Sequence, residues 1–450
     1  MVESVGYFGD QRRQRRGAKL FEQIVARSSL VQRRVGGDRA GEIAMDRFLG
    51  CPEVTKEEIL QTLSQRTAER CAGRRIVVAQ DTTEVNFSGR ELGRVGLGPG
   101  GDGASAGFFI HAAVAIDVAD EAVIGIAAAE IWTRRGRVEG TQWQRRHADK
   151  ESARWLRTAQ TVRERLRAAE QVIVVSDREG DIYRFFAECP QGTDLVVRSA
   201  QNRSVQGGGL LFEEPAQWKV LSRTTIELLP RKAGEKPRTA TVELRAGRVR
   251  LCRPKYAAAN EPPCVELSLV EAREVGAPRG VKPLHWRLLS TLPADDAAQA
   301  AGIVRLYRLR WRIEQVFRAL KNDGLQLPDV QMQRADKLLK LAALGVGAAV
   351  RILQLVDARH RSPRPASDVA DPLVIYAASL IAPTLQGRTA RQQNPHPHGS
   401  LSWLSWLVAR LGGWNCYYKP PGPKTMAHGW NRLIEQARGI LLASNCTQNV

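Results

Sequence analysis

The sequence predicts an α/β protein: a mixed β-sheet with a β-rich insertion, flanked by an N-terminal and a C-terminal helical region. Three observations support this prediction. Short apolar, β-branched runs alternate with amphipathic helical stretches in the first half of the chain. A long segment of β-type residues with scattered Pro and Gly follows, and both ends have helical patterns. At 450 residues, the chain is too long for one compact core and fits two or three domains.

The charge balance indicates a polyanionic partner. The chain carries 67 Lys and Arg residues against 47 Asp and Glu residues, which gives a net charge of +20. A protein this basic repels itself unless it binds a polyanion, and nucleic acid is the first candidate. An anionic membrane is the alternative, but the apolar runs at 341–350 and 373–382 are far shorter than the roughly 20 residues of a bilayer-crossing helix. We therefore expect no membrane partner.

The cysteines and the N-terminal residues indicate a cytoplasmic protein. The seven cysteines are scattered and contain no Cys-x-x-Cys pair, which argues against a disulfide framework and against structural zinc. The first residues, MVESVGYFGDQRRQRRGAK, lack the apolar stretch of a signal peptide. Together with the basic charge, this predicts a cytoplasmic protein associated with the nucleoid.

The N-terminal region reads as a small basic helical domain that ends near residue 72. Helices are predicted over Gln11–Arg27 and Gly41–Phe48. A third helix is predicted to begin after Thr55, with Glu58 completing a capping box. Taken alone, the RRQRR run fits a solvated amphipathic helix equally well.

The central region alternates strands and helices. The predicted elements are, in order, strands at 75–80, 108–116 and 122–132, a helix at 150–169, a strand at 171–175, a helix at 182–189 and a strand at 195–198. Residues 205–280 form the β-rich insertion, and a strand at 285–292 and a long helix from Asp296 to about Asn322 follow. The prolines at 363, 365 and 372 predict a linker into the C-terminal helices. The predicted domains are therefore 1–72, 73–365 and 366–450.

Two acidic residues follow predicted buried strands. Asp81 comes after RIVVAQ, and Asp177 comes after QVIVVS. Strand ends hold side chains rigidly at the rim of a sheet, where active sites recur. Asp also favours turns, and for either residue alone turn formation is the better explanation.

A third acidic residue lies on the long predicted helix. One set of residues at spacings of three and four shares a helical face: Tyr307, Arg310, Glu314, Phe317 and Lys321. A neighbouring set forms the predicted core stripe: Leu306, Leu309, Ile313, Val316 and Leu320. The first set is then expected to edge a cleft, with Glu314 among basic side chains. A salt-bridged surface helix is the alternative.

Asp81, Asp177 and Glu314 together could hold two divalent cations. Carboxylates are ligands that Mg²⁺ prefers, and a substrate phosphate would complete the coordination shell. Two metal ions suit the cleavage of a phosphodiester bond.

Three segments carry a specific resemblance. VAQDTTEVNF, VVSDREGDIYRF and YRLRWRIEQVFRALK resemble the carboxylate motifs of bacterial cut-and-paste DDE transposases. More narrowly, they resemble the insertion-sequence-four family, which contains the kanamycin-resistance composite transposon. The third segment matches that family's Tyr-x2-Arg-x3-Glu-x6-Lys signature at Tyr307, Arg310, Glu314 and Lys321. FGDQRRQRR and DRFLGCPEVTKEEIL resemble its end-binding domain, and RLGGW and HGWNRL resemble its dimerisation region.

The resemblance implies a fold, a reaction and roles for individual residues. The fold would be ribonuclease H-like, and the reaction would be cut-and-paste transposition through a hairpin at the transposon end. Asp81, Asp177 and Glu314 would be the catalytic metal ligands, for Mg²⁺ with Mn²⁺ as a substitute. The partners would be double-stranded DNA, as inverted terminal repeats and as target, and a second copy of the chain in a homodimeric paired-end complex.

The DNA contacts come from two parts of the chain. The resemblance implies contacts near the cleaved end from Tyr307, Arg310, Lys321, Trp286, Arg178 and Arg198. Trp286 would stack on a flipped base, whereas without the resemblance it would be assigned to the core. The charge of the first helix predicts metal-independent phosphate contacts by Arg12, Arg13, Arg15, Arg16 and Lys19. The segment AMDRF departs from the family pattern, so we expect a different end sequence.

Two alternatives remain open. A non-catalytic DNA-binding regulator of transposition would need the basic surfaces but no intact carboxylate set. A metal-dependent nuclease without strand transfer would need the carboxylates but not Trp286 or the C-terminal region.

Overall fold

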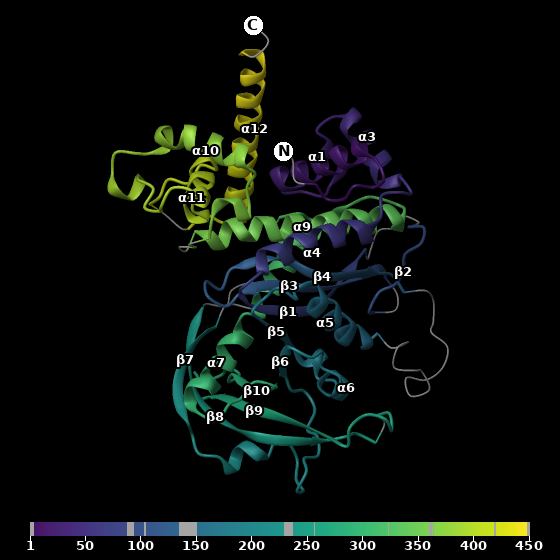
Figure 1. Ribbon diagram of the computed structural model, residues 1–450, viewed down its shortest axis with the longest axis vertical. Coiled ribbons are helices and arrows are strands. Elements are labelled where there is room, and N and C mark those ends of the chain that lie inside the picture. Colours follow the sequence, from purple (N-terminus) through teal and green to yellow (C-terminus); the bar gives the residue numbers. More distant parts are fainter. Residues whose placement is uncertain are drawn as a thin grey trace. The chain divides into compact units, whose positions relative to one another are not determined.

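The computed structural model describes residues 4–87, 94–102, 105–134, 151–228, 237–255, 257–322, 324–359, 362, 364–417 and 420–447. The chain divides into two compact units, and most of their helices and strands are labelled in Figure 1. Unit 1 comprises Met1–Ala72, Thr82–Val138 and Arg312–Val450. Unit 2 comprises Gly73–Asp81 and Glu139–Trp311. The three domains expected from the sequence stay a prediction.

Unit 1 begins with four helices: α1 (Gln11–Arg27), α2 (Gln32–Gly36), α3 (Arg39–Gly50) and α4 (Lys56–Cys71). The predicted bounds of α1 are confirmed, and Asp10 caps the helix by accepting a hydrogen bond from the Arg12 amide at 2.8 Å. The short helix α2 was not predicted from the sequence.

Of the two hydrogen bonds of the capping box predicted at α4, one forms. Thr55 is the N-cap, and its hydroxyl accepts from the Glu58 amide at 3.2 Å. The Glu58 carboxylate instead accepts from the amides of Tyr7 and Phe8, at 2.6 and 2.7 Å. The expectation of a reciprocal box was therefore wrong, because Glu58 stabilises the N-terminal segment rather than its own helix.

Unit 1 contains the strands β2 (Gly98–Pro99), β3 (Ala106–Asp117) and β4 (Val123–Trp132). It also contains the last residues of β1 (Arg75–Asn86). β3 pairs antiparallel with both β2 and β4. Helices α4 and α9 (Ala335–Ala358) pack on β4 (Figure 1). The predicted strands at 108–116 and 122–132 are thus confirmed.

Helix α9 is the central helix of unit 1. It is long and apolar enough to cross a membrane by composition, but 89% of its most apolar window is buried inside the protein, as in the core helix of a soluble protein. Two glycines allow neighbouring side chains to approach closely. A Cβ at Gly345 would come within 2.8 Å of Leu30, and one at Gly347 within 2.9 Å of Leu63. The other C-terminal elements are α8 (Trp311–Lys321), α10 (Pro372–Leu385), α11 (Leu401–Leu411) and α12 (Pro423–Thr447).

Unit 2 is built on a mixed sheet in the strand order β1-β5-β6-β10-β9-β8-β7. Its strands after β1 are β5 (Gln171–Ser176), β6 (Thr193–Arg198), β7 (Ser222–Leu228), β8 (Arg238–Cys252), β9 (Cys264–Glu274) and β10 (His285–Ser290). β1, β5 and β6 are parallel, and the remaining pairs are antiparallel. This arrangement confirms the predicted mixed α/β architecture, and β7, β8 and β9 lie within the segment expected to be β-rich.

The helices of unit 2 are α5 (Ala153–Arg165), α6 (Tyr183–Ala187) and α7 (Ala297–Arg308). The predicted start of α5 at Lys150 lies outside the described residues.

The long helix predicted from Asp296 to Asn322 is interrupted. Helix α7 ends at Arg308 and α8 begins at Trp311. Between them, the amides of Leu309 and Arg310 donate to the carbonyls three residues earlier, at 3.1 Å each, which is the tighter hydrogen-bond pattern of a 3-10 turn. The residues from Tyr307 to Lys321 therefore do not share one continuous helical face. The predicted core stripe is confirmed, because all five of its side chains are buried.

Candidate functional site

In unit 2, Asp81 and Asp177 each come directly after the last pair of residues that joins two neighbouring parallel strands. β1 and β5 pair from Arg75 with Gln171 to Gln80 with Ser176. β1 itself continues to Asn86, so the expectation that this strand ends before Asp81 was wrong. The parallel pairing nevertheless ends at Gln80, and neighbouring strands lie about 4.8 Å apart. The two aspartates are therefore neighbours at the carboxyl end of the ladder.

Asp177 has a well-defined local role. Its carboxylate accepts a hydrogen bond from the Glu179 amide at 2.9 Å and caps the short 3-10 helix Arg178–Gly180. The turn function proposed as the alternative for this residue is thus observed. The pKa of Glu179 is raised overall. Partial burial is the larger cause, the negative charge of Asp177 adds to it, and the positive charge of Arg154 opposes it. Arg178 is exposed in the same turn.

Arg310 binds Asp81. Its guanidinium donates to Asp81 Oδ2 at 3.2 Å, and the two side chains are 14% and 15% exposed. A guanidinium in this place neutralises a carboxylate and offers further donors for a phosphate oxygen. The interruption of the predicted long helix places Arg310 in the turn between α7 and α8.

Tyr307 is buried next to these charged groups. The pKa of its hydroxyl is raised overall, mainly because the side chain is buried. The charge of Asp177 also raises this pKa, whereas the charges of Arg310 and Arg198 partly oppose the shift. Arg198 itself ends β6 and donates to the His285 carbonyl at 3.3 Å. Unit 2 thus brings together five of the residues selected from the sequence: Asp81, Asp177, Arg198, Tyr307 and Arg310.

Trp286 lies on β10 and packs against Tyr307. Their ring centroids are 5.1 Å apart at an interplanar angle of 72°, an edge-to-face contact. The Trp286 side chain is only 8% exposed. This position agrees with the core-aromatic alternative, and stacking on a base would require the indole to leave its contact with Tyr307.

Glu314 and Lys321 lie on α8 in unit 1, and both are partly buried. Arg312 anchors this helix by donating to Asp357 Oδ1 on α9 at 2.9 Å. The pKa of Asp357 is raised overall because its carboxyl is buried, and the charge of Arg312 opposes this shift. The sequence analysis missed this pair, because an arginine and an aspartate so far apart in the chain leave no local pattern.

A buried ion pair in unit 2 was also missed. The Asp181 carboxylate binds Arg203 and accepts from the amides of Ala200 and Gln201 at 2.7 and 2.9 Å. These bonds join the turn after Asp177 to the loop after Arg198. The second aspartate of the segment DREGD was the one available indication.

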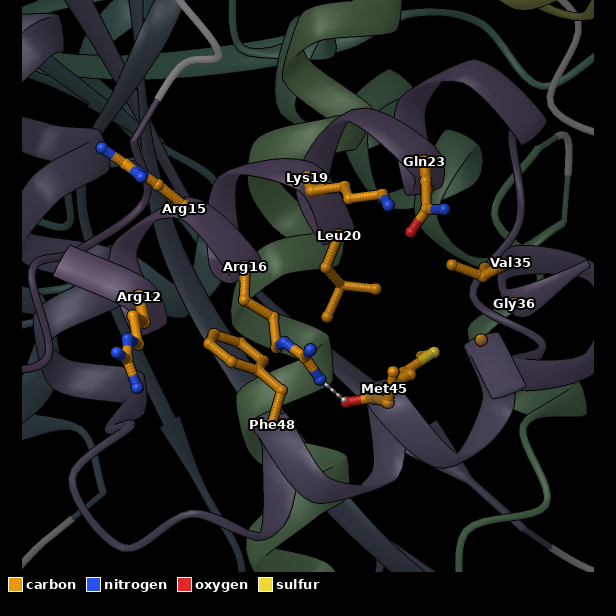
Figure 2. Close-up of a pocket in the computed structure, with 12 residues that line it drawn as sticks. Arg12, Arg15, Arg16, Lys19, Leu20, Gln23, Val35, Gly36, Met45 and Phe48 are labelled. Atoms are coloured by element: carbon orange, nitrogen blue, oxygen red, sulfur yellow. Dashed lines mark hydrogen bonds between the residues drawn. The ribbon is translucent and has the colours of Figure 1, made fainter. Parts of the chain in front are cut away.

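A basic groove lies on unit 1 along α1. It has a volume of about 480 Å³, and Arg12, Arg15, Arg16 and Lys19 line it above an apolar floor that includes Phe48 (Figure 2). All four basic side chains are at least partly exposed, and Arg16 also donates to the Ala44 carbonyl at 3.5 Å.

Arg13 differs from its four neighbours. It does not line the groove, it donates to the Phe8 carbonyl at 2.9 Å, and it lies 3.6 Å from the Glu53 carboxylate. Its side chain therefore binds within the protein.

One comparison with known proteins bears on this arrangement. Residues 143–350 match the family model described as the transposase DDE domain. The match supports a DDE transposase family. It covers less than half of the chain and includes Asp177, Tyr307, Arg310 and Glu314, whereas Asp81 precedes it. The mixed α/β architecture with its large mixed sheet is consistent with the ribonuclease H-like fold of a DDE transposase domain.

DDE transposases generally use a divalent metal, and the donor chemistry here fits one. Asp81 and Asp177 present carboxylates from adjacent positions, and carboxylate oxygens are suitable ligands for Mg²⁺. Across the ranges that the structure describes, no group of three or more His, Cys, Asp or Glu side chains lies close enough to hold a metal ion. The full set of metal ligands therefore stays a prediction.

Proposed function

We propose that this chain is a cut-and-paste DNA transposase that binds the inverted terminal repeats of its own element and cleaves phosphodiester bonds at their ends. The observation that carries the proposal is the adjacency of Asp81 and Asp177 at the end of the β1–β5 ladder, with Arg310 bound to Asp81. Two neighbouring carboxylates beside a guanidinium suit phosphoryl transfer, because the acids can hold cations while the arginine binds phosphate.

In this proposal Asp81, Asp177 and Glu314 hold Mg²⁺, or Mn²⁺ in its place. Cations held by these carboxylates would supply Lewis-acid activation of the attacking hydroxyl and stabilisation of the leaving oxygen. Arg310, with Arg178, Arg198 and Lys321, holds the phosphates near the cleaved end. Tyr307 keeps its proton, because burial raises its pKa, so its hydroxyl can donate to a phosphate oxygen.

The α1 groove is proposed to bind the end DNA. Exposed guanidinium and ammonium groups contact phosphates without reading bases, so this binding needs no metal. The reaction then proceeds through strand transfer to target DNA, with a hairpin at the transposon end. The apolar side chains of Tyr376 and Leu380, 55% and 50% exposed on α10, support a homodimer that pairs two ends through the C-terminal helices. The site of action is the cytoplasm, at the nucleoid.

A metal-dependent nuclease without strand transfer is the second candidate. The burial of Trp286 favours it, because a buried indole offers no base-stacking surface for an excised end. Joined products with a target plasmid would exclude this candidate.

The test is cleavage of labelled DNA that carries the element's own ends, with and without Mg²⁺. We expect nicking by the native protein in Mg²⁺, and no nicking by the variants Asp81→Asn, Asp177→Asn and Glu314→Gln, which keep side-chain size but remove one charge. Asp295→Asn is the matched control, because Asp295 is 62% exposed in a surface ion pair with Arg248.

The same variants should bind end DNA nearly as well as the native protein in gel shifts. Efficient cleavage by one of the three would remove that residue from the site. Efficient cleavage by all three, or no cleavage by the native protein, would contradict the proposed reaction.

A further inference from the structure

A second basic pocket lies in unit 1, away from the α1 groove. It has a volume of about 610 Å³ and is formed by the end of α1, by α2, by the segment after α8 and by the start of α12. Its described lining residues are Ala26, Arg27, Ser28, Arg34, Asn322, Gly324, Gln326, Lys424, Ala427, His428 and Asn431. We call it the α12 pocket.

The described lining of the α12 pocket is cationic. Arg27, Arg34 and Lys424 are exposed or partly exposed and carry positive charges, and the imidazole of His428 can gain one. The remaining polar lining residues are amides and a hydroxyl, and no carboxylate is among the described lining residues. Asp323 lies outside the described residues. A pocket lined in this way favours an anion.

The start of α12 adds to this preference. The helix begins at Pro423 and runs for 25 residues, so Lys424 lies in its first turn and His428 in its second. The first amides of a helix have no acceptor within the helix, and the helix dipole places partial positive charge at this end. The first turn contains no acidic side chain. The α12 residues that line the pocket lie along one side of the first turns, so their side chains form the anion-attracting surface and the helix dipole adds to it.

Hydrogen bonds hold the arginines at the pocket without removing their charge. Arg27 Nη1 donates to the Arg34 carbonyl at 2.6 Å, and Arg34 donates to the side-chain oxygen of Gln326. Both acceptors are neutral, so the guanidiniums keep their attraction for a phosphate. An ion pair between Arg438 and Glu22 ties α12 to α1, which keeps the two sides of the pocket together.

We propose that the α12 pocket binds a phosphate group of the DNA backbone, as a second contact surface besides the α1 groove. The inference rests on the proposed function, because it takes DNA as the ligand. The pocket is open and its cations are accessible, as contact with a continuous backbone requires. Its lining offers charges and donors for phosphate oxygens, so the contact is independent of base sequence. A small free phosphate compound shares this chemistry and forms a separate arm of the test.

The test compares two double variants of the full chain that lower the net charge equally. Arg27→Gln/Lys424→Gln alters the pocket, and Arg388→Gln/Arg391→Gln alters two exposed arginines between α10 and α11. Binding to double-stranded DNA is measured by fluorescence anisotropy over a range of salt concentrations. We expect the pocket variant to lower the slope of log K against log salt by about 0.9 for each phosphate that it no longer neutralises, and the control to leave the slope unchanged.

A charge-conserving variant, Arg27→Lys/Lys424→Arg, should restore the slope of the native protein. This result separates loss of charge from loss of folding, which thermal unfolding monitors in parallel. Equal slopes for the pocket variant and the control would overturn the inference. So would a slope that the charge-conserving variant fails to restore.

The free-phosphate arm uses calorimetric titration with inorganic phosphate. Phosphate binding that the pocket variant abolishes, with unchanged DNA binding, would assign the pocket to a small phosphate compound and overturn the DNA assignment.

Cleavage of end DNA is measured on the same proteins. Native protein that binds and cleaves its ends, with a pocket variant equal to the control, would contradict this inference alone. Native protein that binds DNA with a pocket-dependent slope but does not cleave would contradict only the proposed reaction. Native protein that does not bind DNA would contradict both.

Discussion

The strand ends of unit 2 and the basic face of α1 use charge in opposite ways. In unit 2, Asp81 is bound by Arg310, and Asp177 accepts from the Glu179 amide at the end of a buried ladder. On α1, four cations are accessible along a groove. Groups that carry out chemistry must be held in one geometry, whereas groups that bind a polyanion need only be accessible.

This difference separates two measurable quantities. Changes at the strand ends should lower the rate of cleavage and leave the salt dependence of DNA binding nearly unchanged. Changes on the α1 face should lower the salt dependence and leave the rate on bound DNA nearly unchanged.

The largest effect is expected from Arg310. Replacing it by Ala removes the group that binds Asp81 and, in the proposed reaction, a donor to the phosphate. Removing one such preorganised donor costs about 10²–10³ in rate. The measurement is single-turnover cleavage of end DNA, with Arg308→Ala, an exposed arginine at the end of α7, as the control. A decrease of less than about tenfold for Arg310→Ala would remove it from the site.

Trp286→Ala should produce the next largest effect and decides between two roles. If the indole leaves its contact with Tyr307 to stack on a base, first-strand nicking is spared and later steps slow by about 5- to 150-fold, because stacking is worth about 1–3 kcal/mol. If Trp286 is a core residue, the variant is instead destabilised by about 3–5 kcal/mol. Thermal unfolding and a time course of cleavage products distinguish the two, with Trp286→Phe retaining an aromatic ring as the control.

The α1 face should change binding alone. Neutralising Arg12, Arg15, Arg16 and Lys19 to Gln should lower the slope of log K against log salt by up to about 0.9 for each phosphate that these side chains no longer neutralise. Arg13→Gln should leave the slope unchanged and lower stability slightly, because Arg13 binds Phe8 and Glu53 within the protein. An unchanged slope in the fourfold variant would exclude this face from the DNA interface. A lower slope for Arg13→Gln would show that its internal contacts break on binding.

The smallest effect concerns a carboxylate of unit 2 with a structural role. Burial would raise the pKa of Glu271, but the hydrogen bond with His285 and the charges of His285, Arg287 and Arg245 lower it overall. A lowered folded-state pKa stabilises the protein above the unfolded value, and this contribution disappears as the pH falls through the folded-state value. Glu271→Gln should therefore cost about 1.5–3 kcal/mol at pH 7.

That difference should shrink below about pH 4.5, the ordinary value for a Glu carboxyl. The measurement is urea unfolding of both proteins over a series of pH values. DNA cleavage at neutral pH should stay near the native rate, in contrast to the variants of Asp81 and Asp177. A stability difference that is independent of pH would show that the Glu271 charge is not the stabilising element.

Much of the fold followed from sequence patterns. The bounds of α1, the strands β5 and β10, and the β-rich insertion are signalled by periodicity and by β-branched runs within the segment itself. The two aspartates could be selected for the same reason, because each follows an apolar run that predicts a buried strand. Their adjacency required the register of β1 with β5, which depends on pairing between distant segments.

The remaining features depend on interactions that leave no local trace. The 3-10 turn at Leu309 and Arg310 lies within an unbroken helical pattern, so the spacing of Tyr307, Arg310 and Glu314 could not reveal it. The Glu58 carboxylate satisfied the capping-box pattern but binds the N-terminal segment. The edge-to-face contact of Trp286 with Tyr307 joins a strand residue to a helix residue and leaves no pattern in either segment. Tertiary contacts decide each of these cases.

Strand β1 has a consequence for how the gene can be divided. Its residues up to Asp81 belong to unit 2 and those from Thr82 to unit 1, and the chain also changes unit after Ala72, Val138 and Trp311. Neither unit is a continuous stretch of the gene, so no single truncation yields one unit intact. A start codon placed after residue 72 would remove the basic helices and retain both aspartates, although it would also deprive α9 of the side chains that pack against its glycines. Exchange of whole units between related genes would require several simultaneous crossovers, and inheritance of the protein as one piece is the expected outcome.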